Sequence, residues 1–223
     1  MTTWSFSSLK TFTQCPKKYY HLKVAKDVKD APNEASLYGE QAHEAAERYI
    51  AEGEELPKQF EFLRPILDSL NAIPGDKYCE VKMGLAESED GYVPCEFFGQ
   101  GVWWRGIADL LIINGGTAYS VDYKTGKNTR YADTTQLDII AAATFIKFPE
   151  VQKIKSALVY VVSNEFIKVT HTRPLTNSYI ATFYPALDKR IRAVPRHRRA
   201  EEETRCTKRS TQDYGKSRQG SQG

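Results

Sequence analysis

The fold is decided by the stretch Gly106-Ile-Ala-Asp-Leu-Leu-Ile-Ile113, followed by Asn114-Gly-Gly116 and then by Ala118-Tyr-Ser-Val-Asp-Tyr-Lys124. Both flanking runs are rich in β-branched and aromatic residues, which favour strands. The short Asn-Gly-Gly segment between them is typical of a tight turn that joins two antiparallel strands. We therefore predict a β-hairpin over residues 106–124.

Helical and strand-like segments surround this hairpin. Apolar residues at three- and four-residue steps predict helices, and short β-rich runs predict strands. The predicted helices cover residues 5–20, broken at Pro16, then 34–51, 60–70, 133–148 and 178–194, the last kinked at Pro185. The predicted strands cover residues 78–85, 96–113, which include the first strand of the hairpin, 156–162 and 166–171. Helices before, between and after the strands predict an α/β protein with a sheet flanked by helices.

Length and charge suggest one folded domain with a tail. The chain has 223 residues, of which 41% are hydrophobic and 26% charged, as in a globular protein with one core. Its net charge is +3, but residues 189–223 hold eleven Lys or Arg against four Asp or Glu, so the rest carries 3 − 7 = −4. We predict a catalytic domain over residues 1–194 and a basic, disordered tail over 195–223.

The chain has no segment that indicates export or a disulfide framework. No apolar run approaches the ~18 residues that a membrane helix needs, and no signal-peptide pattern opens the sequence. The four cysteines, Cys15, Cys79, Cys95 and Cys206, are scattered and form no C-x-x-C pair. We expect a cytoplasmic protein with reduced thiols and no contact with membranes.

Two aspartates lie within the hairpin strands. Asp109 and Asp122 are each flanked by residues that favour burial, and carboxylates seldom occupy such positions without partners. Because the strands turn at residues 114–116, both aspartates fall toward the same end of the ladder. Their mutual repulsion would raise a pKa unless a cation neutralised both, so a divalent metal ion is the predicted partner.

Lys124 follows Asp122 by two residues. Strand side chains alternate between faces, so Asp122 and Lys124 should point the same way and Tyr123 the other way. An ammonium beside a metal could orient the attacking water and offset charge on a phosphorane-like transition state. The pattern thus predicts hydrolysis of phosphodiesters.

These motifs resemble those of the RecB-like branch of the PD-(D/E)XK nuclease superfamily, the branch that includes the CRISPR adaptation exonucleases. The matching segments are Ser7-Ser-Leu9, Gly39-Glu-Gln-Ala-His43, Gly106-Ile-Ala-Asp109, Val121-Asp-Tyr-Lys-Thr-Gly126 and Gln136-Leu137. The resemblance covers residues 4–162 and implies a restriction-endonuclease-like α/β fold, with a central mixed β-sheet flanked by helices.

The resemblance also implies roles for individual residues. His43, Asp109, Asp122 and the Tyr123 carbonyl would bind the metal, Lys124 would be the catalytic lysine, and Gln136 would act near the site. The ion would be Mg²⁺ or Mn²⁺, and a histidine ligand favours Mn²⁺ more than an all-oxygen site would.

Many members of the family hold an iron–sulfur cluster, and this chain departs from them in its cysteines. Cys15 stands at the position of their first cluster cysteine, but Cys206 is the sole cysteine in the C-terminal part, where they have three. A cluster usually needs four thiolates. We therefore expect no cluster.

Some residues remain open between a site role and a structural one. Glu80 is either a solvated strand residue or part of the site. The Trp103-Trp104-Arg105 run could stack on bases, although strand aromatics more often pack in the core.

Together these features predict a metal-dependent DNA nuclease, of exonuclease type, in recombination, repair or phage DNA metabolism. Its partner would be linear single- or double-stranded DNA, and a homo-oligomer or a recombination or replication protein is a further candidate partner. The rival hypothesis is a DNA-binding accessory module that kept the fold without catalysis, and a third is an RNA or nucleotide phosphodiesterase.

Overall fold

The structure is a computed structural model that describes residues 3–31, 33–126, 129, 130 and 132–193. It divides into two compact units, one made of residues 1–6 and 31–183 and the other of residues 7–30 and 184–223. The predicted tail, 195–223, lies outside the described residues. The larger unit contains the hairpin and is described first.

The strands of the larger unit form one six-stranded sheet in the order β2-β1-β3-β4-β5-β6. Neighbouring strands are antiparallel except β4 and β5, which run parallel because α5 connects them. The strands are β1 Asp76–Ser88, β2 Gly91–Cys95, β3 Val102–Asn114, β4 Thr117–Lys124, β5 Lys153–Tyr160 and β6 Glu165–Thr172. The sheet is therefore mixed, as predicted.

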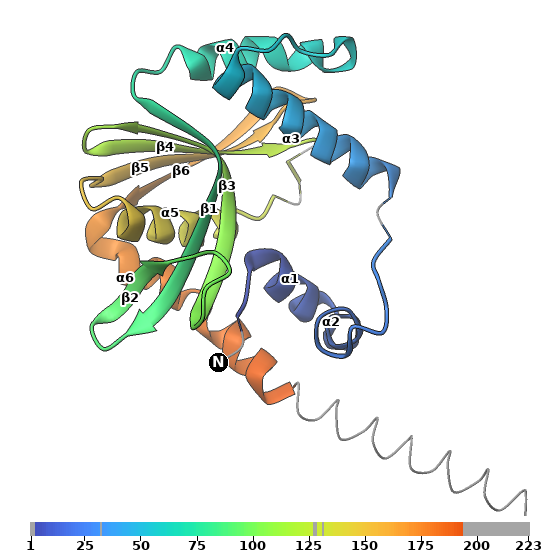
Figure 1. Ribbon diagram of the computed structural model, residues 1–223, viewed down its shortest axis with the longest axis vertical. Coiled ribbons are helices and arrows are strands. Elements are labelled where there is room, and N and C mark those ends of the chain that lie inside the picture. Colours follow the sequence, from blue (N-terminus) through green and yellow to red (C-terminus); the bar gives the residue numbers. More distant parts are fainter. Residues whose placement is uncertain (1–2, 32, 127–128, 131, 194–223) are drawn as a thin grey trace, which may run out of the picture. The chain divides into compact units, whose positions relative to one another are not determined.

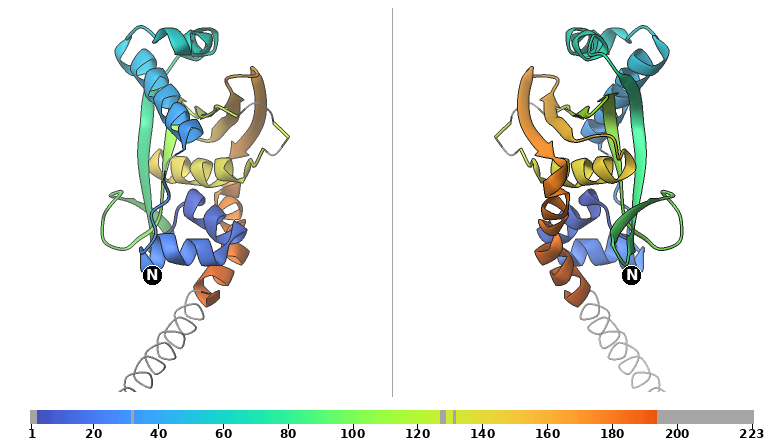
Figure 2. Two further views of the ribbon diagram at one scale, coloured as in Figure 1. Left: turned by 90° about the vertical axis from the view of Figure 1, so that its right-hand side faces the viewer. Right: turned by 90° about the vertical axis from the view of Figure 1, so that its left-hand side faces the viewer.

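Helices cover both faces of this sheet. Figure 1 shows α3 and α4 above β4, β5 and β6, with α5 below them, and Figure 2 shows the same layers from two sides. The helices of this unit are α3 Glu34–Glu52, the 3-10 helix η2 Lys58–Leu63, α4 Arg64–Asn71, α5 Thr135–Lys147, the 3-10 helix η3 Arg173–Leu175 and α6 Thr176–Ala181. The predicted α/β architecture, a central mixed sheet flanked by helices, is confirmed.

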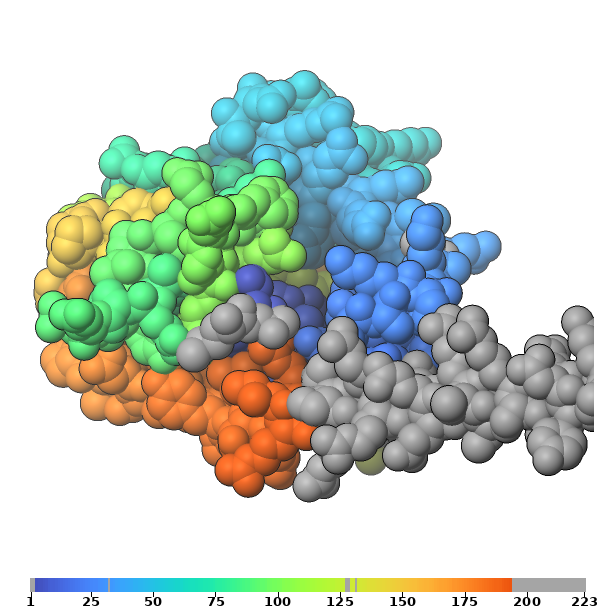
Figure 3. All heavy atoms as spheres, turned by 60° about the horizontal axis from the view of Figure 1, so that its bottom comes forward, coloured from blue at the N-terminus to red at the C-terminus, as the bar shows by residue number. Residues whose placement is uncertain are grey.

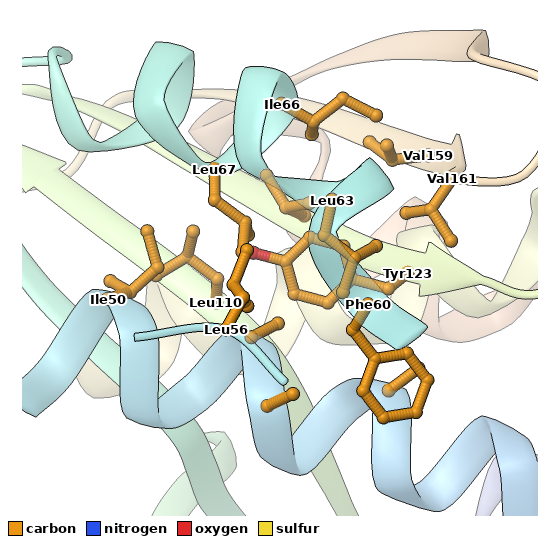
Figure 4. Close-up of a cluster of buried hydrophobic side chains, with 14 of the residues drawn as sticks. Ile50, Leu56, Phe60, Leu63, Ile66, Leu67, Leu110, Tyr123, Val159 and Val161 are labelled. Carbon is orange, nitrogen blue, oxygen red and sulfur yellow. The ribbon is translucent and has the colours of Figure 1, made fainter. Parts of the chain in front are cut away.

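Hydrophobic clusters hold the layers together. In one of them, side chains of α3, η2 and α4 pack on Leu110, Tyr123 and Val159 of the sheet (Figure 4). In another, Phe145 of α5 packs with Ile154 and other residues of β3, β4 and β5. Burial of this apolar area stabilises the sandwich at roughly 25 cal/mol per Å², and it fixes which strand faces meet which helix.

The helix α3 has strong signals at both ends. Asn33 accepts a hydrogen bond from the Ser36 amide, and the Ser36 side chain bonds back to the Asn33 amide, which makes a capping box. Gly53 ends the helix in the left-handed conformation, at φ 70°. The predicted helix over 34–51 is confirmed with a one-residue difference at its end.

The strand predicted over residues 96–113 begins later than expected. Residues 96–101 form a turn instead, in which the Gly99 amide donates to the Glu96 carbonyl (2.9 Å) and Gly101 adopts a φ of 75°. The short strand β2, which precedes this turn, was not predicted. The two glycines decide the difference, because they permit a chain reversal where the aromatic residues nearby favour a strand.

The helix predicted over residues 178–194 is interrupted. It ends as α6 at Ala181, Thr182 and Phe183 form a turn, and residues 184–193 are helical again, while residue 194 lies outside the described residues. Pro185 stands in the first turn of the later helix, where its missing N–H costs no hydrogen bond. It therefore starts a helix, whereas we had predicted a kink.

The smaller unit contains most of α1 Phe6–Gln14, α2 Pro16–Tyr19, the π-helical segment η1 Tyr20–Ala25 and the helical residues 184–193. Pro16 begins α2, and the Cys15 sulfur accepts from the Lys18 amide at 3.4 Å, so the predicted break at Pro16 is confirmed. The guanidinium of Arg190 lies over the Tyr19 ring, 5.9 Å from its centroid. Within the described part of the chain, no helix is long and apolar enough to cross a membrane.

Candidate active site

Two carboxylates face each other across the central strands β1 and β3. The ladder pairs Cys79 with Leu110 and resumes on the other side at Val81, so the same register brings Glu80 opposite Asp109. Acidic side chains in directly opposed positions repel each other. The ladder omits this one pair, which shows that the sheet is locally opened at the two carboxylates.

The neighbouring strand β4 adds a third carboxylate, that of Asp122. The last paired residues of β3 and β4 are Leu110 and Val121, so Asp109 and Asp122 occupy the following, opened position. There the Tyr123 amide donates to Asp109 Oδ2 (2.8 Å). The prediction that Asp109 and Asp122 lie at the same end of the hairpin therefore agrees with the register.

Glu80 itself has an unusual backbone. Its φ is 48°, in the left-handed region that non-glycine residues seldom adopt within strands. Burial raises the pKa of Glu80 and the Glu47 charge raises it further, while the charge of Lys82 lowers it. A strained backbone that holds an acid beside other acids is a feature that often marks a functional site.

Glu80, Asp109 and Asp122 together form the carboxylate row. His43 of α3 contacts this row. Its Nε2 lies 3.0 Å from the Tyr123 carbonyl oxygen, and its Nδ1 lies 3.4 Å from Asp109 Oδ2. If Nε2 donates to the carbonyl, Nδ1 carries a lone pair that faces a carboxylate, so a proton or a cation must lie between them. Burial lowers the pKa of His43 and disfavours the proton. A metal ion therefore fits this contact better than a protonated imidazole does.

The donor atoms are close enough for one ion. One nitrogen of His43 and one carboxylate oxygen each of Glu80 and Asp109 lie within 4.8 Å of one another. Burial, and secondly the charge of Asp122, raise the pKa of Asp109 well above its ordinary value, whereas the hydrogen bond from Tyr123 lowers it. The charge of a divalent cation would offset both the cost of burying the Asp109 carboxylate and its repulsion by Asp122.

Lys124 and Gln136 both contact the carboxylate of Asp122. Lys124 Nζ lies 2.5 Å from Asp122 Oδ2 and donates to Gln136 Oε1 at 3.3 Å, and Gln136 Nε2 donates to Asp122 Oδ1. As predicted from strand alternation, Asp122 and Lys124 point the same way. Gln136 belongs to the first turn of α5, so this helix closes the site.

Of the predicted residues, His43, Asp109 and Tyr123 are therefore in direct contact, and Lys124 and Gln136 surround Asp122. Glu80, which the sequence left open, joins His43 and Asp109. No local motif marks Glu80, because its neighbour Asp109 is 29 positions away and is brought close solely by the register of β1 on β3.

Gly39 lets α3 approach the end of β4. A Cβ atom at this position would lie 3.3 Å from Thr125 Oγ1, closer than most such contacts. The glycine therefore makes room for Thr125, the residue that follows Lys124.

The tryptophans near the site belong to the core. Trp103 and Trp104 are 6% and 0% exposed, and Trp103 packs edge-on against Trp4 with ring centroids 5.2 Å apart. A Cβ at Gly106 would overlap the Trp104 ring at 2.4 Å, so the glycine of this motif makes space for the indole. The idea that the two tryptophans stack on bases is therefore wrong, because they are inaccessible.

Among the described cysteines, the site contains none as a candidate ligand. Cys15 is exposed and caps α2, whereas burial raises the pKa of Cys79 to about 11. Cys206 lies outside the described residues. Our expectation that no iron–sulfur cluster forms stays a prediction.

A buried polar chain anchors the helix that carries Gln136. His171 of β6 is 1% exposed, its Nε2 lies 2.9 Å from Asp138 Oδ1, and its Nδ1 lies 3.1 Å from Ser156 Oγ. The Tyr179 ring packs edge-on against the imidazole, at 4.8 Å between centroids. Since Asp138 stands two residues after Gln136, these bonds tie the first turn of α5 to β5 and β6.

We expect the substitution His171→Ala to lower the free energy of unfolding by about 2–4 kcal/mol, because it leaves a cavity and deprives Asp138 and Ser156 of their partner. Urea unfolding followed by circular dichroism measures this change. Ser156→Ala, which removes one hydrogen bond, should cost about 1 kcal/mol. Equal stability of the His171→Ala and wild-type proteins would show that the buried chain does not anchor α5.

The mixed six-stranded sheet flanked by helices is a restriction-endonuclease-like α/β fold. Its hairpin carries the acidic side chains, and the Asp122-x-Lys124 pair lies beside Gln136 of α5. The family model for the PD-(D/E)XK nuclease superfamily matches residues 3–208. The chain belongs to this superfamily.

Two solved structures are similar to the chain. One is a candidate exonuclease from Eubacterium rectale, 15% identical, covering 86% of this chain and 80% of its own, with a TM-score of 0.48. The other is SSO0001, 12% identical, covering 86% of this chain and 76% of its own, with a TM-score of 0.41. Among curated proteins, none matches.

Proposed function

We propose that the chain is a metal-dependent deoxyribonuclease that degrades linear DNA as an exonuclease, with its catalytic domain in residues 1–194. The observation that carries the proposal is the contact of His43 Nδ1 with the Asp109 carboxylate inside a row of acidic side chains. This cluster favours a divalent cation, and the resemblance to the RecB-like branch favours DNA as substrate and a place in recombination, repair or phage DNA metabolism.

His43, Asp109, Asp122 and the Tyr123 carbonyl would hold Mg²⁺ or Mn²⁺, and Glu80 would join them. Such an ion, when bound, lowers the pKa of a coordinated water and offsets the charge of the phosphate. Nitrogen and carboxylate oxygen are donors that suit these ions, and the histidine shifts the preference toward Mn²⁺. The donor set thus fits a hydrolytic centre.

Lys124 and Gln136 carry the protein's own part of the chemistry. The Lys124 ammonium lies beside the Asp122 carboxylate, so it can orient the attacking water and offset the negative charge that develops on the phosphate oxygens. Gln136 holds both groups through its amide, which keeps the lysine at the site. In the reaction, the water oxygen bonds to phosphorus, one backbone P–O bond breaks, and the departing oxygen takes up a proton.

The proposal is tested with end-labelled linear single-stranded and double-stranded DNA beside a closed circle, each incubated with Mg²⁺, Mn²⁺ or EDTA. We expect metal-dependent loss of the linear DNA and survival of the circle. Cleavage of the circle would contradict the exonuclease assignment and leave a nuclease. Binding of DNA without cleavage of any substrate under both metals would favour the accessory-module hypothesis.

A further inference from the structure

An exposed aromatic side chain lies on the loop between β2 and β3. Phe98 is 79% exposed, the most exposed of the large hydrophobic side chains in the described residues. Its ring packs edge-on against Phe97, with centroids 4.8 Å apart. In Figure 3 the segments of β1, β2 and this loop, in green, lie at the surface. The ring is therefore accessible to a ligand or partner.

A cation accompanies these rings. The guanidinium of Arg105 lies 5.6 Å from the centroid of Phe97 and 5.2 Å from that of Phe98. Within the described ranges, no carboxylate forms an ion pair with Arg105. The positive charge is therefore held at the surface by aromatic faces and stays available to an anion.

The geometry of the sheet explains how the loop reaches Arg105. Gly84 is the residue paired with Arg105, and a Cβ on it would lie 2.8 Å from the Cys95 carbonyl oxygen and 3.1 Å from that of Glu96. The backbone of the loop therefore crosses directly over Gly84. Any larger residue there would push away the segment that carries the two phenylalanines.

These groups are connected to the carboxylate row along β1 and β3. Ile107, 40% exposed, pairs with exposed Lys82, which follows Glu80 by two residues on β1. Arg105 follows on the same face as Ile107, since strand residues two apart share a face. From Arg105 to Asp109 the strand extends about 13 Å, at ~3.3 Å per residue.

We propose that this surface, the Phe98 strip, made of Lys82, Phe97, Phe98, Arg105 and Ile107, binds the nucleic-acid strand next to the phosphodiester that is cut. One base would stack on Phe98, and Arg105 and Lys82 would contact phosphates. Exposed apolar rings alone would suit a protein partner equally well. The two cations and the continuity with the carboxylate row favour a strand of alternating phosphates and flat bases.

The proposal rests on the proposed nuclease function, and it implies tolerance of sequence, because each base has a face that can stack. The strip therefore serves an enzyme that degrades DNA without regard to sequence, and it favours an unpaired strand, whose bases are free to stack. An intact duplex offers the strip its phosphates alone.

The test measures binding of a fluorescent 12-nucleotide single strand in the Lys124→Ala background with Mg²⁺, so that no cleavage interferes. We expect Phe98→Ala and Arg105→Ala to raise the Kd about 5- to 100-fold, the range for loss of one stacked base. Phe98→Trp should restore binding. The matched control is Phe166→Ala, since Phe166 is 46% exposed with Lys168 Nζ 5.5 Å from its centroid, yet lies on the edge strand β6.

A second measurement separates this proposal from the nuclease proposal. Hydrolysis of bis(p-nitrophenyl) phosphate by the wild-type protein tests the carboxylate row without the strip, because this diester is too small to reach it, and circular dichroism of Phe98→Ala shows whether the variant is folded. An unchanged Kd in the Phe98 and Arg105 variants, or an equal loss in Phe166→Ala, would overturn the strip whether or not the wild type cleaves. If the wild type cleaves neither substrate but binds the strand through Phe98, the strip stands and the nuclease proposal fails.

Discussion

Replacing Lys124 by alanine is expected to lower the rate of DNA cleavage by about 10²- to 10⁴-fold, the contribution typical of a positioned acid–base or charge-stabilising group. The Lys124 ammonium lies 2.5 Å from Asp122 Oδ2, and the first turn of α5 carries no lysine or arginine that could replace it. Binding of DNA and metal should change far less, because the carboxylates and His43 remain.

Single-turnover cleavage at saturating enzyme measures this effect and separates it from binding. Lys147→Ala is the matched control, since this lysine is exposed at the far end of α5 and should leave the rate unchanged. A Lys124→Ala protein that cleaves within about threefold of the wild-type rate would exclude the lysine from the chemical step.

Asp109→Asn is expected to abolish cleavage and also the stabilisation of the protein by metal. Wild-type protein should gain about 2.7 kcal/mol of unfolding free energy at a metal concentration 100 times the Kd. The variant should gain almost nothing, because Asp109 is central to both the histidine contact and the carboxylate row. Without metal, however, the variant should be at least as stable as the wild type, since the amide keeps an acceptor for the Tyr123 N–H and removes a repelled charge.

The same reasoning sets the pH dependence of the metal-free protein. Because the pKa of Asp109 is raised on folding, its contribution to stability is fully present below the pKa of the unfolded aspartate and is lost as the pH rises through the higher folded value. The wild-type midpoint should therefore fall over that window more than the midpoint of Asp109→Asn. Thermal unfolding with EDTA and with Mn²⁺ measures both effects, with Asp90→Asn in the exposed β1–β2 turn as the control. Equal metal stabilisation of wild type and Asp109→Asn would refute the assignment of Asp109 as a ligand.

Local patterns in the chain were sufficient for the central hairpin and for half of the site. The run of β-branched residues around Asn114-Gly-Gly116 specifies two paired strands, and their alternation alone directs Asp122 and Lys124 to one face. The helix that carries His43 follows from its composition and from the glycine that ends it. The turn over residues 96–101 was missed, because aromatic neighbours favour a strand while two glycines decide otherwise.

What the sequence by itself determined is therefore the set of elements, the mixed α/β class and the residues of the hairpin motif, since these depend on neighbours within a few positions. The tertiary structure alone decided that Glu80 faces Asp109, that Trp103 and Trp104 are buried, and that Phe98 and Arg105 meet at the surface. The physical reason is that a β-ladder brings residues together by register. The register of β1 on β3 depends on the whole packed sheet and on the loop over Gly84, and no local spacing encodes it.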